Sequence, residues 1–179
     1  MKQLNNYIQE KLILNKTIKH INYTYHPKTK DELKELINDL IKERGNKANL
    51  NDIDTSEITD MSNLFYKSSF NGDISKWDVS NVTNMWGMFD YSKFNGNISD
   101  WDVSNVEDMS EMFKDSKFTG ENGDISDWNV SNVKDMRGMY YNSKFNRDIS
   151  DWDVGNVKNM YNMFYDSPLE KNPPKWYKE

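Results

Sequence analysis

Pairs of aspartates with one residue between them recur along this chain and could do acid–base chemistry. Asp100 and Asp102 form one pair, and Asp151 and Asp153 form another. If each pair lies on one face of a strand, its carboxylates are roughly 7 Å apart, a separation that inverting glycosidases use. An active site needs one asymmetric pocket in which the two carboxylates have unequal pKa values. Because the pairs recur in successive repeats, we expect no enzyme activity.

Other catalytic and cofactor sites lack the residues they need. The chain has no Cys, and His20 and His26 are its only histidines. A thiolate nucleophile, a disulfide framework and a Cys-based zinc site are therefore excluded, and a Ser-His-Asp triad is disfavoured. The glycine-rich phosphate-binding motifs are also missing from the sequence. Residues 122–129, NGDISDWN, offer the oxygen ligands that calcium prefers, but their acids alternate with tryptophan instead of clustering in a turn. We expect no cofactor and no metal.

The aspartates belong to copies of one phrase. ISKWDVSNV, residues 74–82, is followed by close copies that begin at residues 98, 125 and 149. The tryptophans of these copies are 24, 27 and 24 residues apart, and the three extra residues lie around Gly120 and Glu121. A fixed period of this length predicts an array of repeats that stack on one another.

Each repeat is predicted to contain a short strand, a turn and one or two helical turns. In the second copy, a period of two puts Trp101 and Val103 on one face and Asp102 on the other. Methionines and a phenylalanine follow at helical spacing, after an acid or amide suited to an N-cap (Asp60, Asn84, Asp108, Asp135, Asn159). We therefore predict an α/β repeat solenoid. It is a leucine-rich-repeat-like right-handed coil of about five repeats of ~24 residues, with an N-terminal helix-strand-helix cap.

Three elements are predicted before the repeats. Leu4, Ile8 and Leu12 recur at helical spacing, so residues 3–14 are expected to form an amphipathic helix. Residues 16–27 are rich in β-branched and aromatic side chains, which favours a strand. In the next segment, a capping box at residues 29–32 opens a helix that Gly45 ends in a left-handed conformation.

These elements divide the chain into four parts. Residues 1–28 are an appendage of helix and strand, 29–49 a capping helix and linker, 50–167 the solenoid, and 168–179 a C-terminal cap. A repeat array must cover its ends. We expect the second helix to cover the first repeat, and Leu169 and Trp176 to cover the last. Ile53 and the four repeated tryptophans are predicted to stack in one interior column.

The phrase DISxWDVSNVxxMxxMF, followed by SxFN, resembles the BspA-like leucine-rich-repeat surface proteins of bacteria. The resemblance covers about residues 29–167. It implies a curved repeat protein without enzymatic activity that serves as a binding surface in adhesion or host contact. One departure is that the asparagines of the phrase fall two residues after a valine, not at the position of the usual asparagine ladder (Asn81, Asn105, Asn132, Asn156).

The sequence is compatible with more than one cellular location and more than one function. The first residues lack the apolar stretch of a secretory signal, and no segment approaches the ~20 apolar residues of a membrane span. This predicts a cytoplasmic or virion-associated protein, whereas the resemblance implies the cell surface or secretion. About 19 opening residues resemble those of proteins from gut bacteriophages, so a structural or accessory virion component is one alternative function. A calcium-dependent adhesion module is another.

Charge indicates the kind of partner. Residues 1–45 hold nine Lys and Arg against six Asp and Glu, and the remaining residues hold 14 against 23. Such an acidic region repels nucleic acid and anionic membranes, so we expect a protein partner with a basic patch and no membrane insertion. The outward positions beside the repeated tryptophans are the candidate binding residues: Lys76, Asp78, Asp100, Asp102, Asp127, Asn129, Asp151 and Asp153.

Overall fold

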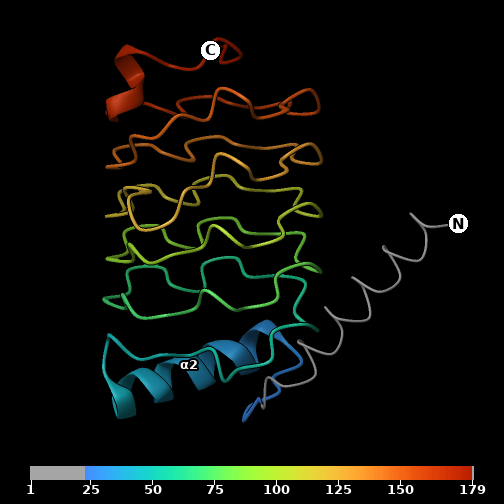
Figure 1. Ribbon diagram of the computed structural model, residues 1–179, viewed down its shortest axis with the longest axis vertical. Coiled ribbons are helices and arrows are strands. Elements are labelled where there is room, and N and C mark those ends of the chain that lie inside the picture. The colour runs from blue at the N-terminus through green and yellow to red at the C-terminus, as the bar shows by residue number, and fades with distance from the viewer. Residues whose placement is uncertain (1–22, 179) are drawn as a thin grey trace, which may run out of the picture.

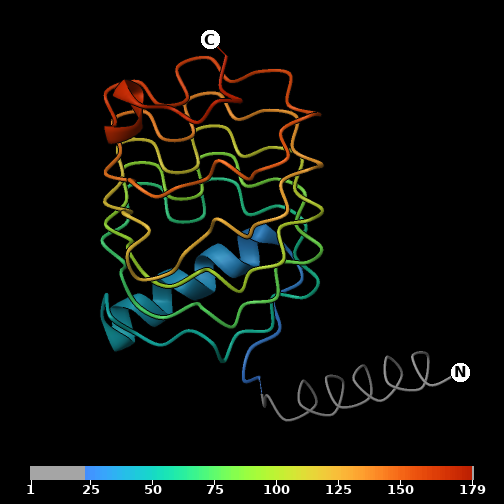
Figure 2. The same ribbon diagram turned by 45° about the horizontal axis from the view of Figure 1, so that its top comes forward.

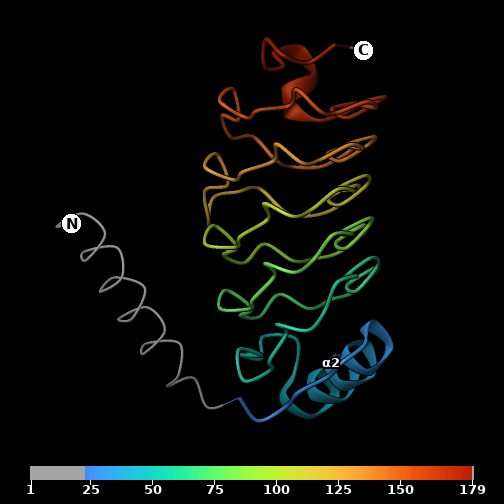
Figure 3. The same ribbon diagram turned by 90° about the vertical axis from the view of Figure 1, so that its right-hand side faces the viewer.

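The computed structural model describes residues 23–178. Helix α2 (Lys30–Arg44) closes one end of a stack of loops, and the short 3-10 helix η1 (Pro168–Lys171) lies at the other end (Figure 1). The side view in Figure 3 shows the loops at successive heights between these two elements. In the tilted view of Figure 2 the loops share one outline. Equivalent positions of successive repeats therefore lie above one another.

The predicted α/β repeat solenoid of the leucine-rich-repeat type is wrong. Within residues 23–178, α2 and η1 are the helices, and backbone pairing is limited to six isolated parallel bridges, with no strand or sheet. The predicted helix at residues 3–14 and the first part of the predicted strand at 16–27 lie outside the described residues. The described end of that strand makes one bridge, between Tyr25 and Ile53. Turns, not strands and helices, build the repeats.

The segment predicted to be helical is a chain of three β-turns in each repeat. Between residues 61 and 68, the N–H groups of Leu64, Tyr66 and Ser68 donate to the carbonyls three residues earlier. Asn63 and Lys67, the third residues of the two outer turns, have φ angles of 56° and 55°. A positive φ there is what a type II turn requires, and it excludes an α-helix. Later repeats have positive φ at the same positions: residues 87 and 91, 111 and 115, 138 and 142, and 162 and 166.

Turns also flank the segment that was predicted to be a strand. The N–H of Trp77 donates to the carbonyl of Ile74, and a second turn spans residues 79–82. Between them, Asp78 Oδ1 accepts the N–H of Ser80 at 3.0 Å. These bonds bend the chain on both sides of Asp78, so the extended run is too short to pair as a strand.

The residues predicted to cap helical turns instead connect the repeats. Asp108 Oδ1 accepts the N–H of Ser110 at 2.8 Å and so closes a turn. The backbone of Asp108 bridges Asn84 on one side and Asp135 on the other. The same bridge joins every neighbouring pair in the series Asp60, Asn84, Asp108, Asp135 and Asn159.

A second ladder uses asparagine side chains. Asn105 Nδ2 donates to the carbonyl of Ser80, and Asn132 Nδ2 donates to that of Ser104, both at 2.7 Å. Asn81 and Asn156 make the equivalent bonds. Each bond satisfies a carbonyl of the preceding repeat. The asparagines therefore form a ladder although they stand at a different position from those of leucine-rich repeats.

The repeated indoles form the spine of the core. Trp77, Trp101, Trp128 and Trp152 are 3–4% exposed, which confirms their predicted burial. Each indole Nε1 donates to a carbonyl of the preceding repeat at 2.9–3.3 Å. Trp176, 24 residues after Trp152, continues the series by donating to the Ile149 carbonyl and stacking on Trp152 at 6.5 Å. Burial and a directed hydrogen bond together fix the register between repeats.

A column of stacked rings runs beside the indoles. Neighbouring ring centroids in the series Phe65, Phe89, Phe113, Tyr140 and Phe164 are 5.5–5.9 Å apart, with planes within 5°. The one tyrosine in this series is fully buried, and its hydroxyl has no hydrogen-bond partner within the described chain. Burial raises the pKa of Tyr140 well above its ordinary value. The hydroxyl is therefore a neutral, unsatisfied polar group in an apolar column.

Replacing Tyr140 by Phe is expected to stabilise the protein. A buried hydroxyl without a partner has lost its water and gained no hydrogen bond, so its removal should raise the free energy of unfolding by about 1 kcal/mol. Urea denaturation measures the change. The matched control is Phe113→Tyr, which places the same group in the equivalent position and should lower the free energy of unfolding. Equal or lower stability of Tyr140→Phe would show that the hydroxyl is satisfied.

Helix α2 begins and ends at the predicted residues, but the ψ angle of 171° at Gly45 is not that of the predicted left-handed conformation. Thr29 Oγ1 accepts the N–H of Glu32 at 3.3 Å, and Gly45 follows the helix with a φ of 83°. The second half of the capping box is shifted, because Glu32 Oε2 accepts the N–H of Lys28 at 2.7 Å. Leu33, Ile37 and Leu40 are buried in one stripe of the helix. They belong to the same apolar core as the repeats.

Candidate functional site

The candidate binding residues form two exposed columns, which we call the acidic columns. The outer column contains Lys76, Asp100, Asp127 and Asp151, and the inner column contains Asp78, Asp102, Asn129 and Asp153; all eight residues are exposed. The inner residues also close turns, since each Oδ1 accepts the N–H two residues later at 3.0–3.2 Å. One oxygen of each inner carboxylate is therefore used locally, and the charge remains at the surface.

Lys76 is the one cation of the acidic columns, and their aspartates lack ion-pair partners within the described residues. The described residues make nine ion pairs, and every one of them uses an acid from elsewhere in the chain. Arg44 with Asp52, at 3.0 Å, and Lys134 with Glu107, at 2.7 Å, are examples. None of the six aspartates in the columns has a cationic partner among residues 23–178. The surface therefore presents uncompensated negative charge.

One predicted site residue borders a hollow. Asp151 lines a space of about 350 Å³ together with Asp124, Asp148 and Arg147. Hydrogen bonds from the hydroxyl and N–H of Ser150 lower the pKa of Asp148. In the part of the chain that the structure describes, no group of three or more His, Cys, Asp or Glu is placed to hold a metal ion.

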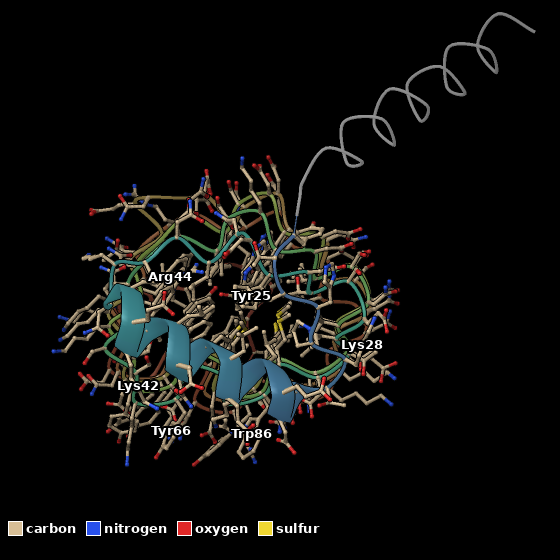
Figure 4. The ribbon with its side chains drawn as sticks, turned by 90° about the horizontal axis from the view of Figure 1, so that it is seen from below. Tyr25, Lys28, Lys42, Arg44, Tyr66 and Trp86 are labelled. Atoms are coloured by element: carbon tan, nitrogen blue, oxygen red, sulfur yellow. The ribbon has the colours of Figure 1, made fainter. Side chains whose placement is uncertain are left out.

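A second surface, which the sequence analysis missed, is aromatic. Tyr66, Trp86, Tyr91, Tyr161 and Tyr165 are 41–64% exposed, and with the half-buried Tyr141 we call them the aromatic strip. The turns that carry these rings are hydrogen-bonded from one repeat to the next. The N–H of Asn63 donates to the Trp86 carbonyl, and the N–H of Gly138 donates to the Tyr161 carbonyl. Figure 4 shows Tyr66 and Trp86 pointing outward along one edge of the stack.

Cations lie among the rings of the strip. Lys67 Nζ is 4.9 Å from the Tyr66 ring and 5.7 Å from that of Tyr91. Tyr66 and Tyr91 meet edge to face at 6.4 Å. Further along, Tyr141 stacks on Tyr165 at 5.0 Å. These two pairs of rings form apolar patches of the kind that mark interaction surfaces.

The strip contains a hollow of about 560 Å³, which we call the Gly138 hollow. Gly138 is buried and has a φ of 59°. At the same position the repeats before and after carry the larger Glu111 and Asn162, which also line the hollow. The missing side chain at Gly138 therefore opens space between its neighbours. Tyr91, Tyr141 and Tyr161 supply ring surface around that space.

Three of the four charges in the hollow pair with one another, and the fourth accepts a hydrogen bond from a neutral amide. Glu111 meets Lys114 at 3.1 Å through one oxygen and Arg137 at 3.6 Å through the other. Asp115 Oδ1 accepts a hydrogen bond from Asn142 Nδ2 at 2.5 Å. Two cations and two carboxylates thus line the hollow, and their formal charges cancel.

One carboxyl group beside the hollow is buried. Asp90 takes the position that Lys114 and Tyr141 take in other repeats, but it is only 7% exposed, and its Oδ1 has no partner within residues 23–178. Burial raises the pKa of Asp90 to about 6; Lys114 opposes this shift, and the carboxylates of Glu111 and Asp115 add to it. Asp90 therefore changes charge closer to neutral pH than an exposed aspartate does.

Comparison with known proteins gives a family. Residues 32–123 and 116–177 match DUF285, which is described as a Mycoplasma protein of unknown function. The chain belongs to the DUF285 family. The two matches to DUF285 overlap in the repeat that carries the three extra residues around Gly120. No curated protein and no solved structure matches the chain. Between residues 23 and 178, this DUF285 member has no helix with the length and apolar character of a membrane span.

Proposed function

We propose that this protein is a non-enzymatic protein-interaction module that docks a basic patch of its partner on the acidic columns. The observation that supports the proposal is that their six aspartates are exposed and without an ion pair within residues 23–178, where other acids make nine ion pairs. The description of DUF285 leaves the role open. The resemblance to BspA-like surface proteins implies the same class of function.

Stacking strengthens the effect of these charges. Neighbouring repeats are bridged backbone to backbone at positions outside the acidic columns, and such bridges set neighbouring repeats about 4.8 Å apart. This is shorter than the Debye length of about 8 Å at physiological ionic strength. The carboxylates therefore act as one field, which steers a cationic partner and weakens as salt is added.

Replacing Asp100, Asp102, Asp151 and Asp153 together by Asn should slow association with a cationic probe by about tenfold or more at low salt. The fold should tolerate the change, because Asn129 already closes the same turn as Asp102 through its Oδ1. A Lys-rich decapeptide is a suitable probe. Stopped-flow measurements between about 0.02 and about 0.3 M NaCl give the rate and its dependence on salt.

The control removes the same charge elsewhere. Four exposed acids of α2 change together: Asp31→Asn, Glu35→Gln, Asp39→Asn and Glu43→Gln. If the acidic columns dock the probe, this variant should associate nearly as fast as the natural chain. Equal slowing in both variants would mean that only net charge matters, and an unchanged rate in the column variant would remove the proposed docking surface.

A further inference from the structure

We propose that the Gly138 hollow binds a stretch of a neutral glycan chain. The hollow lies on the aromatic strip, so this site is independent of the acidic columns and of the proposed protein docking. Its volume of about 560 Å³ falls within the range of about 300 to 1,000 Å³ typical of small-ligand sites. Shape, charge and ring surface each support a neutral, hydroxyl-rich ligand.

The charge balance disfavours an ion. Glu111 already holds both Lys114 and Arg137, and Asp115 already accepts from Asn142. A cation or an anion entering the hollow must break one of these pairs or bind beside a like charge. A neutral ligand meets no net charge and can leave every pair in place.

The same groups retain hydrogen-bonding capacity that hydroxyls can use. A carboxylate offers about four lone-pair sites, so Glu111 can accept from hydroxyl groups beyond its two cations. Arg137 and Lys114 carry five and three donors respectively, and their contacts with Glu111 leave several of these open. A sugar hydroxyl both donates and accepts. The donors and acceptors that line the hollow therefore suit a sugar hydroxyl better than they suit an apolar side chain.

The rings supply the apolar part of the contact. Tyr91, Tyr141 and Tyr161 line the hollow, and Tyr161 is 64% exposed. A tyrosine combines an apolar ring face with a polar tip, and a pyranose likewise combines a C–H face with a polar edge. The strip continues past the hollow to Tyr66 and Trp86 in the earlier repeats, which gives a longer chain further rings to contact.

The main alternative occupant is a basic peptide, whose cations would meet the carboxylates of Glu111 and Asp115. Lys114 Nζ lies 5.8 Å from the Tyr141 ring, and Arg137 pairs with Glu111. The chain's own cations thus hold the positions that a peptide's Lys or Arg would take. The structure therefore favours the glycan, and the two ligands differ in their response to salt.

The test titrates the folded chain with maltohexaose, cellohexaose and chitohexaose, followed by calorimetry and by saturation-transfer NMR. We expect saturable binding of at least one oligosaccharide with a Kd below about 10 mM. Its affinity should be unchanged between about 0.05 and about 0.5 M NaCl, because no net charge is neutralised. A Lys-rich decapeptide serves as the competing probe.

Gly138→Asn is the decisive variant. Asn63 and Asn162 occupy the equivalent position with φ angles of 56° and 55°, close to the 59° of Gly138. An asparagine should therefore fit the backbone while its side chain fills the hollow, and oligosaccharide affinity should fall by about tenfold or more. Thermal denaturation confirms that the variant folds. Tyr161→Ala, which removes an exposed ring, should weaken binding without filling the space.

Three results would overturn the proposal. One is the absence of saturable binding with all three oligosaccharides, and another is equal affinity of Gly138→Asn and the natural chain. The third is salt-sensitive binding of the Lys-rich peptide that Gly138→Asn abolishes, which would assign the hollow to a peptide. The fourfold Asn variant of the acidic columns should bind oligosaccharide normally, so a failure of this site and a failure of the protein docking surface are distinguishable.

Discussion

Trp101→Ala should lower the free energy of unfolding by about 3 to 5 kcal/mol. The indole is 4% exposed, and its Nε1 donates to the Ile74 carbonyl of the preceding repeat at 3.2 Å. Its ring also faces Phe89 at 6.3 Å. The substitution therefore leaves a cavity and breaks a bond between two repeats. Total stabilities of about 5 to 15 kcal/mol are usual, so much of the array's stability should be lost.

Trp86→Ala is the matched control for this prediction. It removes the same side chain from the repeat before, but Trp86 is 41% exposed and belongs to the aromatic strip. Its backbone contacts, which include the bond from the Asn63 N–H, stay in place. We expect a loss below about 1 kcal/mol. Circular dichroism during urea unfolding measures both variants, and equal losses would contradict the assignment of Trp101 to the spine and Trp86 to the surface.

The position of Trp101 also predicts how the stack responds. In an array of repeats, stability is roughly a sum of terms for single repeats and for their interfaces. Trp101 lies inside the indole series, between Trp77 and Trp128, so its loss weakens an internal interface and should broaden the unfolding transition. Trp176 is at the end of the series and only partly buried. Trp176→Ala should therefore lower stability less than Trp101→Ala does.

Burial and period were predictable from the sequence because they depend on spacing alone. The fixed interval between tryptophans identifies the positions that stack, and large apolar side chains at such positions must leave water. The limits of α2 were predictable for another local reason. Thr29 accepts the N–H of Glu32 within one turn, and Gly45 is the residue best suited to a positive φ.

The type of local structure was not predictable from apolar spacing. Methionine and phenylalanine at helical intervals suit an amphipathic helix, but three consecutive turns bury them equally well. Glycine, asparagine or aspartate at most of the positive-φ positions is the signal for turns, as at Gly87 and Asn162. Lys67, Tyr91 and Glu111 adopt the same conformation with no such signal. Their neighbours in the stack impose it through hydrogen bonds to the next repeat.

The same error concealed part of the candidate site. The acidic columns were predictable from the alternation of apolar and polar residues around Trp101 and Trp152. Residues on either side of a buried indole point outward whether or not a strand forms. The aromatic strip could not, since Tyr66 and Tyr165 occupy one position of the repeat and Tyr91 the next, and the turn structure is what makes both positions face outward. The Gly138 hollow depends on a glycine that lies between the larger Glu111 and Asn162 at the equivalent positions of the neighbouring repeats, and this becomes meaningful only when the repeats are stacked.

Asp90→Asn should remove a pH dependence of stability. The pKa of Asp90 in the folded protein is about 6, above the value of about 3.9 for an unfolded aspartate. Between these values the folded state holds more protons, so stability falls as pH rises from about 4 through about 6 and then levels off. The charged carboxylate should cost the natural chain about 1 to 3 kcal/mol at neutral pH.

The measurement compares the natural chain with Asp90→Asn at several pH values. The two proteins differ only at residue 90, so the difference between their free energies of unfolding reports this carboxyl and its interactions with Lys114, Glu111 and Asp115. As pH rises from about 4 to about 7, the free energy of unfolding of Asp90→Asn should increase relative to that of the natural chain. Asp100→Asn, which removes an exposed carboxyl, is the matched control. A difference for Asp90→Asn that does not change with pH would show that water or a neighbour solvates Asp90 in the folded state, and the raised pKa would be wrong.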